Sequence, residues 1–244
     1  MADTSRRPAF YAAGPGRWRD WWNLLHPPYT AWHLAYVVIG ASLAPHTDAV
    51  RLTATVLAFF GAVGIAAHAF DEVNGHPLRT AIPDAALWSV ATAGLAGSLV
   101  LGVLGIGRVG FGLLIFMVIG PLVVVGYNLE LLGGRLHTDT MFALGWGTFP
   151  VLTGYFAQAQ GIGIVAVFAG AAAFALSYAQ RTLSTPARLL RRHVTRVDGT
   201  LVLDDGSARR LDRGVLLEPL ERALHALAWS TVGLAVAMAV ARLR

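Results

Sequence analysis

Six polar side chains that suit metal or anion binding lie close together in the stretch AAHAFDEVNGHPLRT. They are His68, Asp71, Glu72, Asn74, His76 and Arg79. If one helix runs through this stretch, His68 shares a face with Asp71, three residues on, and with Glu72, four residues on. Carboxylate oxygens on such a face suit a divalent cation such as Mg²⁺, whereas imidazole together with carboxylate suits zinc or iron.

The alternative for this first cluster is that the helix has already ended. The same residues then lie in a solvated loop, where Asp71 or Glu72 pairs with Arg79. Acidic side chains at membrane depth are costly and usually face a cavity or a partner. This cost favours a functional role for the cluster taken as a unit.

A second group of polar residues ends another apolar run, in the stretch GYNLELLGGRLHTDT. Its members are Tyr127, Asn128, Glu130, Arg135, His137 and Asp139. Taken singly, Tyr127 suits an aromatic residue at the membrane interface, and Arg135 suits a charge that sets topology. If both clusters emerge on one side of a membrane, they can line one cavity.

The elements that must position these clusters are apolar helices. The chain is 55% hydrophobic and 14% charged, with a mean hydropathy of +0.57, whereas a soluble domain is about 25% charged. Apolar blocks of about 16 to 22 residues match the length of a transmembrane helix. The sequence therefore predicts an all-α, polytopic membrane bundle of about seven transmembrane helices, over residues 30–45, 52–70, 85–106, 109–129, 142–160, 161–180 and 223–241.

The distribution of arginine predicts how this bundle is oriented. With the N-terminus inside and the C-terminus outside, all arginines except Arg51, Arg108, Arg242 and Arg244 fall on the inner side. The positive-inside rule therefore predicts a multi-pass protein of the cytoplasmic membrane. The net charge of +5 reflects this topology and contacts with anionic lipid, so we expect the bilayer as partner and no nucleic acid.

Four segments follow from this reading. Residues 1–28 form an interfacial N-terminal segment, 29–183 carry the first six helices, 184–221 form a polar insertion, and 222–244 contain the last helix. Within the insertion, the stretch HVTRVDGTLVLDDGSARRLDR alternates apolar and polar residues around two Asp-Gly pairs. This pattern predicts a small β-meander that caps the bundle.

Three stretches resemble the UbiA-type intramembrane prenyltransferases, and the likeness covers roughly residues 18–182. They are LLHPPYTAWHLAYVVIGASLA, AHAFDEVNGHPLRT and GYNLELLGGRLHTDTMFALGWGTFPVLTGYF. The resemblance implies a helical bundle, typically of nine spans, with a central cavity open to the cytoplasm and to lipid. It implies transfer of a prenyl group from a prenyl diphosphate, with Mg²⁺ held by two Asp-rich motifs.

The resemblance also suggests roles for individual residues. Asp71 and Glu72 become Mg²⁺ ligands, with Asn74, Tyr127 and Asn128 in the same site. The side chains assigned to the diphosphate and its surroundings are Arg79, Arg181, Glu130 and Arg135. The chain departs from the family where the second motif belongs, because SYAQRTLSTPARLLRR contains no acid. It also has about two predicted spans fewer.

Two alternatives remain open on the same scaffold. One is a non-catalytic relative that binds a lipid, quinone or pigment, or that assembles with another membrane protein or with itself. The other is a zinc or iron enzyme with its ligands drawn from His68, Asp71, Glu72, His76, Glu130, His137 and Asp139.

Overall fold

The computed structural model describes residues 9, 11–14 and 16–243, and it is mostly helical, with 74% of residues in helices. Within this part of the chain, four helical segments are long and apolar enough to cross a membrane. The first is continuous from Ala49 to Val73 and comprises α3 (Ala49–Phe59), the π-helical η2 (Phe60–Ala67) and α4 (His68–Val73). The others are α5 (Asp84–Val109), α9 (Ile164–Arg192) and α10 (Arg213–Arg242). These segments are those of a membrane protein.

The other helices are shorter. They are α1 (Arg17–Leu24), α2 (Pro27–Leu43), α6 (Leu113–Asn128), α7 (Asp139–Ala143), the π-helical η3 (Leu144–Thr148) and α8 (Phe149–Ala159). Each predicted span lies mainly on a helix, and the span predicted over 142–160 falls on α7, η3 and α8, which follow one another directly. A bundle of seven transmembrane spans stays a prediction.

Hydrogen bonds from side chains to backbone explain where several helices begin. Asp48 accepts from Arg51 N at 2.8 Å before α3, and Asp212 accepts from Val215 N at 3.1 Å before α10. These bonds satisfy N–H groups that have no partner in the first turn of a helix. The bond from Arg51 N also lowers the pKa of Asp48, because it favours the charged carboxylate.

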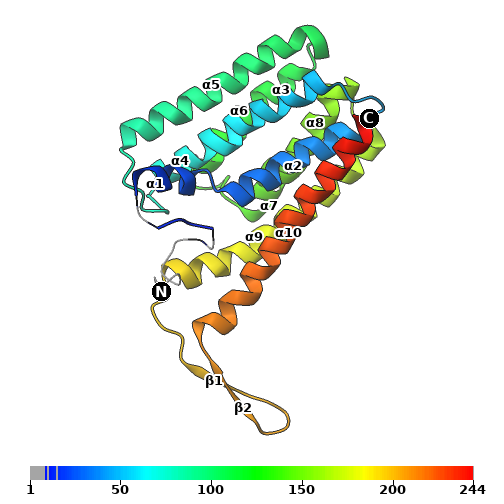
Figure 1. Ribbon diagram of the computed structural model, residues 1–244. Coiled ribbons are helices and arrows are strands. Elements are labelled where there is room, and N and C mark those ends of the chain that lie inside the picture. Colours follow the sequence, from blue (N-terminus) through cyan, green and yellow to red (C-terminus); the bar gives the residue numbers. More distant parts are fainter. Residues whose placement is uncertain (1–8, 10, 15, 244) are drawn as a thin grey trace.

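Close backbone approach of α2 and α8 holds the centre of the bundle. An added Cβ at Gly40 would lie 2.8 Å from the carbonyl carbon of Val151, and one at Gly154 would lie 3.0 Å from that of Val37. Small residues allow this approach, which drives helix association in lipid. Figure 1 shows α5, α6 and α3 on one side of this pair, and α9 with α10 on the other.

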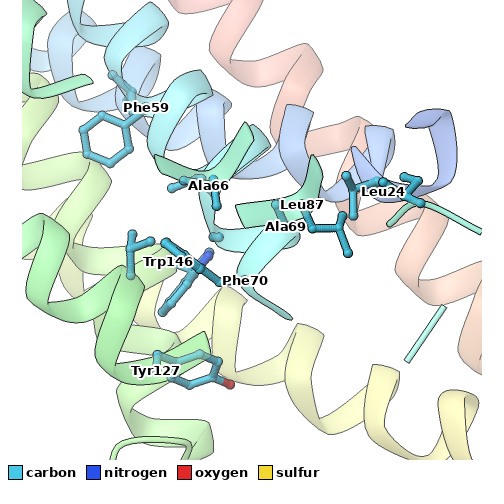
Figure 2. Packing of buried hydrophobic residues seen from close by; sticks show 14 residues of the cluster. Leu24, Phe59, Ala66, Ala69, Phe70, Leu87, Tyr127 and Trp146 are labelled. Carbon is cyan, nitrogen blue, oxygen red and sulfur yellow. The ribbon is translucent and has the colours of Figure 1, made fainter. Parts of the chain in front are cut away.

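An apolar cluster joins the helices that carry the two polar clusters. Figure 2 shows Phe59, Phe70, Tyr127 and Trp146 packed together, from α3, α4, α6 and η3. The Tyr127 and Trp146 rings lie 4.6 Å apart between centroids. This packing brings the end of α4 beside the end of α6, although 54 residues separate Asn74 from Asn128.

The polar insertion is shorter than predicted. Helix α9 continues to Arg192 and α10 begins at Arg213, so the boundaries predicted at 184 and 221 lie inside helices. Between them, β1 (Gly199–Val202) and β2 (Ala208–Leu211) form an antiparallel pair in which Gly199 faces Leu211. Within the described residues this is a two-stranded hairpin, not a meander, because only the second Asp-Gly pair makes the connecting turn, with Gly206 at φ +79°. The hairpin projects away from the bundle (Figure 1).

A polar cavity as the candidate functional site

A polar cavity of about 290 Å³ lies at the end of the bundle that carries α1 and the hairpin. Members of both predicted clusters line it, so the two clusters meet in space. The predicted residues in its wall are His68, Asp71, Asn74, Tyr127, Asn128, Glu130, His137 and Arg181. Five predicted residues are not in its wall: Glu72, His76, Arg79, Arg135 and Asp139.

The first cluster contributes an imidazole and a carboxylate to the cavity. His68 Nδ1 lies 3.2 Å from Gly64 O in the π-helical segment, and the His68 ring stacks on His26 with 4.5 Å between centroids. Asp71 lies one turn further along, and its carboxylate makes no hydrogen bond or ion pair within the described residues. Asp71 is therefore available to a ligand.

Glu72 has a different role from the metal ligand predicted for it. Its side chain is fully buried (0% exposed), and one oxygen accepts from Leu78 N at 2.9 Å. The other oxygen accepts from Thr80 N at 2.8 Å and from Thr80 Oγ1 at 2.9 Å. These bonds fold the loop after α4 against the helix. Glu72 is therefore not part of the candidate site.

The remaining residues of the first cluster divide between the cavity and the loop. Asn74 Nδ2 donates to Asn128 O at 3.2 Å and so links the two clusters. His76 lies in the loop, 3.2 Å from Asp84 Oδ1, and Arg79 is exposed. Neither His76 nor Arg79 lines the cavity in which Asp71 lies.

The second cluster contributes an aromatic wall. The Tyr127 and His137 rings stack with 4.3 Å between centroids, and His137 Nδ1 lies 3.2 Å from Tyr127 O. Arg181 of α9 donates to Asp139 Oδ1 at 2.8 Å, and its Nη2 lies 3.2 Å from His137 Nε2. Asp139 thus does not line the cavity itself but binds Arg181, which does. Arg135 is exposed and does not line the cavity.

Helix α9 supplies Arg181, which was predicted, together with further residues that the sequence analysis missed. Its face toward the cavity carries Gln180, Arg181, Ser184, Ala187, Arg188 and Arg191, and Arg192 also lines the cavity. The spacing of three and four residues is helical and could have been recognised in the sequence. Arg188, Arg191 and Arg192 were instead attributed to the polar insertion, because the apolar pattern ends near residue 180. Arg191 forms an ion pair with Glu221 of α10.

Three polar atoms in the cavity wall are buried without a hydrogen-bond partner in the described part of the chain. They are His26 Nε2, Tyr127 Oη and Gln180 Oε1. Buried polar groups are normally hydrogen-bonded, and an unsatisfied one calls for an explanation such as a bound molecule. Because Tyr127 can donate and the Gln180 oxygen can only accept, the expected ligand carries both acceptor and donor groups.

The segment before α1 closes one side of the cavity. Tyr11 bonds His26 Nδ1 through its hydroxyl and packs edge-on against Tyr29. Asn23 of α1 holds this segment through Ala13, accepting from Ala13 N at 2.7 Å and donating to Ala13 O at 3.1 Å. Burial, together with the neighbouring His68 ring, lowers the pKa of His26 well below its usual value.

An apolar cleft of about 330 Å³ lies next to the polar cavity, between α3, α5, α6 and α8. Its wall includes Phe59, Val63, Leu95 and Phe116, and its charged groups lie at the opposite end of the bundle. Trp146 belongs to the walls of both the cleft and the polar cavity. An amphiphile could thus place a polar head on one side of this ring and an apolar chain on the other.

Comparison with protein family models, with curated proteins and with solved structures finds no match. Membership of the UbiA-type family therefore stays a prediction that rests on the three stretches quoted above. Within the described residues, no group of three or more His, Asp or Glu side chains is arranged to hold a metal ion. The Mg²⁺, zinc and iron sites likewise stay predictions.

Proposed function

We propose that this protein is an intramembrane enzyme that binds a prenyl diphosphate and transfers or otherwise processes its isoprenoid chain. The observation that carries the proposal is the adjacency of an arginine-lined cavity and an apolar cleft, with Trp146 in the wall of both. A prenyl diphosphate has the same division into an anionic head and an apolar tail. The head binds beside Asp71 and Arg181, and the tail lies in the cleft.

The proposal includes seven transmembrane helices with the cavity at the cytoplasmic face. Its support is the distribution of charge in the bundle. Arg51 and Arg108 lie at the end opposite the cavity, where Arg51 donates to Arg108 O, and Arg242 donates to Ser42 O at the same end at 2.8 Å. Most other arginines lie toward the cavity end, as the positive-inside rule requires of a cytoplasmic face.

The cavity supplies groups for a transfer reaction. When the acceptor bonds to the prenyl carbon and the carbon–oxygen bond to diphosphate breaks, the acceptor loses a proton. Asp71 takes this proton, because its carboxylate lines the cavity and has no partner among the described residues. The Tyr127 hydroxyl and the Gln180 amide oxygen orient the acceptor.

The family resemblance implies Mg²⁺, but the residues of the cavity do not fit a pair of magnesium ions. Mg²⁺ requires a near-octahedral set of oxygen ligands, usually with one or two carboxylates for each ion. Three carboxylates from the described part of the chain line the cavity: Asp71, Glu130 and Glu221. Glu221 is paired with Arg191, and Glu130 lies 3.7 Å from His137 Nδ1. No step above depends on a metal.

The test uses detergent-purified protein and geranylgeranyl diphosphate, with geranylgeraniol as the ligand that lacks the head. We expect thermal stabilisation by the diphosphate only, and release of diphosphate when an acceptor is present. Asp71→Asn should retain binding and lose release, while Asp204→Asn in the exposed hairpin should match wild type. Equal stabilisation by geranylgeraniol, or none by either ligand, would contradict the proposal.

A second candidate is a relative that binds a quinone or another flat ring without reacting. The observation that favours it is the aromatic wall, in which Phe142 and Trp146 are nearly parallel, at 4° and 5.6 Å between centroids. Stabilisation by ubiquinone or menaquinone, together with no diphosphate release from any prenyl diphosphate, would favour this candidate. A role as a subunit of a membrane complex would then be tested by co-purification.

A further inference from the structure

Four arginines of α9 gather where the resembled family has its second acidic motif. They are Arg181, Arg188, Arg191 and Arg192, and all four line the cavity. We call them the arginine face. Two of its members have acidic partners, since Arg181 donates to Asp139 at 2.8 Å and Arg191 pairs with Glu221.

Arg188 differs from those two because it makes no ion pair within the described residues. Its one hydrogen bond there is a long one, 3.4 Å to Thr185 Oγ1. Arg181 and Arg192 lie on the same helix as Arg188 and line the same cavity, and their charges act unfavourably on Arg188, with Asp71 as the opposing charge. Such an arrangement is unfavourable unless an anion lies among the charges.

The same charges oppose a cation at Asp71. Asp71 is the lining carboxylate with no partner among the described residues, and of the charges that act on it those of Arg188 and Arg192 have the largest effect. A magnesium ion held by this single carboxylate would be repelled by the guanidinium groups. The electrostatics of the cavity thus favour a ligand that is itself negative.

We propose that the arginine face binds the phosphate-bearing head of the ligand directly, chiefly through Arg188, and that binding needs no divalent cation. The proposal rests on the proposed function and specifies how the protein binds the diphosphate of its substrate. A guanidinium group offers paired N–H donors that match two oxygens of one phosphate group. The buried Tyr127 hydroxyl lines the same cavity and supplies a further donor.

The experiment measures the Kd of a fluorescent prenyl diphosphate for the full-length protein, in EDTA and in excess Mg²⁺. We expect binding in EDTA with a Kd within about threefold of the value in Mg²⁺. Arg188→Gln should weaken binding by roughly tenfold or more, as the loss of charge-assisted hydrogen bonds implies. Arg188→Lys, which keeps the charge but not the paired donors, should fall between the two.

The matched control is Arg209→Gln, in the exposed β2 strand, which should bind as wild type does. Thermal stability of each variant without ligand shows whether it is folded. Binding that requires Mg²⁺, or an Arg188→Gln variant that binds like Arg209→Gln, would overturn the arginine proposal and leave the prenyl-diphosphate function standing. Wild type that binds the probe in neither condition would overturn both.

A phosphate group could also come from bulk anionic phospholipid. Nanodiscs of phosphatidylglycerol and of phosphatidylcholine separate these sources. We expect the Kd of the probe to be the same in both nanodiscs. A higher Kd in phosphatidylglycerol than in phosphatidylcholine would show that the lipid competes with the probe. If this difference were absent in Arg188→Gln, it would support the arginine face as a phosphate site and overturn prenyl diphosphate as its preferred ligand.

Discussion

The polar cavity and the apolar cleft share the wall at Trp146 but differ in how their walls are built. The cavity wall carries four arginines and three carboxylates, of which some are paired and some are not. Among the residues that the structure describes, the charged groups of the cleft are Arg51 and Arg108, and both lie at the end remote from Trp146. The charged groups that line these two spaces therefore lie toward the two ends of the bundle, and those at the cavity end have partners or a ligand to meet.

The largest loss of stability should come from a substitution in the wall that the cavity and the cleft share. Trp146→Ala removes a side chain that is 4% exposed and joins the two spaces. Loss of a buried tryptophan costs about 3–5 kcal/mol, so we expect a markedly lower midpoint of thermal unfolding. Trp146→Phe retains a ring and should lose much less. Equal unfolding midpoints for the two variants would mean that a ring at position 146 does not stabilise the wall between the two spaces.

The next largest effect should distinguish the roles of two adjacent acidic residues, Glu72 and Asp71. Glu72→Ala leaves the N–H groups of Leu78 and Thr80 without their acceptor, at a cost of about 2 kcal/mol or more. Asp71→Ala removes a carboxylate with no partner in the described chain and should leave the unfolding midpoint nearly unchanged while reducing ligand turnover. Heating followed by size-exclusion chromatography measures the folded fraction. A larger stability loss for Asp71→Ala than for Glu72→Ala would reverse the assignment.

A pH dependence should distinguish the cavity end from the opposite end. Because burial lowers the pKa of His26, the folded ring stays neutral where the unfolded ring, with its ordinary pKa of 6.5, takes up a proton. Stability should therefore fall as the pH decreases below about 6.5. His26→Gln should reduce this fall, whereas His46→Gln, an exposed residue at the opposite end, should not. Unfolding midpoints measured from pH 5 to pH 8 test this difference.

The smallest effect should come from the cap of α3 at the opposite end. Asp48→Ala removes the acceptor of Arg51 N and should lower the unfolding midpoint slightly, without changing ligand binding. The change should shrink at acidic pH. The pKa of Asp48 is lowered in the folded state, so its contribution is present above the unfolded pKa and is lost as the pH falls through the folded pKa. A loss of ligand affinity would show that the two ends are coupled.

Local pattern predicted much of this fold. The apolar runs identify the positions of the helices, because burial of a helix in lipid depends on the composition of about twenty consecutive residues. The polar residues that end α4 and α6 identify where a site could form. The predicted topology allowed the two groups to converge without requiring it, and members of both line one cavity in the structure.

Other features depended on distance along the chain and on helix rotation. Adjacent helical residues point about 100° apart, so Asp71 faces the cavity while Glu72 faces its own loop. The apolar pattern of α9 ends well before the helix does, and for this reason Arg188, Arg191 and Arg192 were not recognised as part of the site.

The sequence by itself determined that this chain is a helical membrane protein and where its two polar clusters lie. The tertiary structure decided which members of those clusters share a cavity, that α9 adds three arginines to it beside the predicted Arg181, and that Trp146 stands between the cavity and an apolar cleft. The reason is physical. Helix formation depends on neighbours along the chain, whereas a cavity is formed by side chains from helices that meet only after they pack.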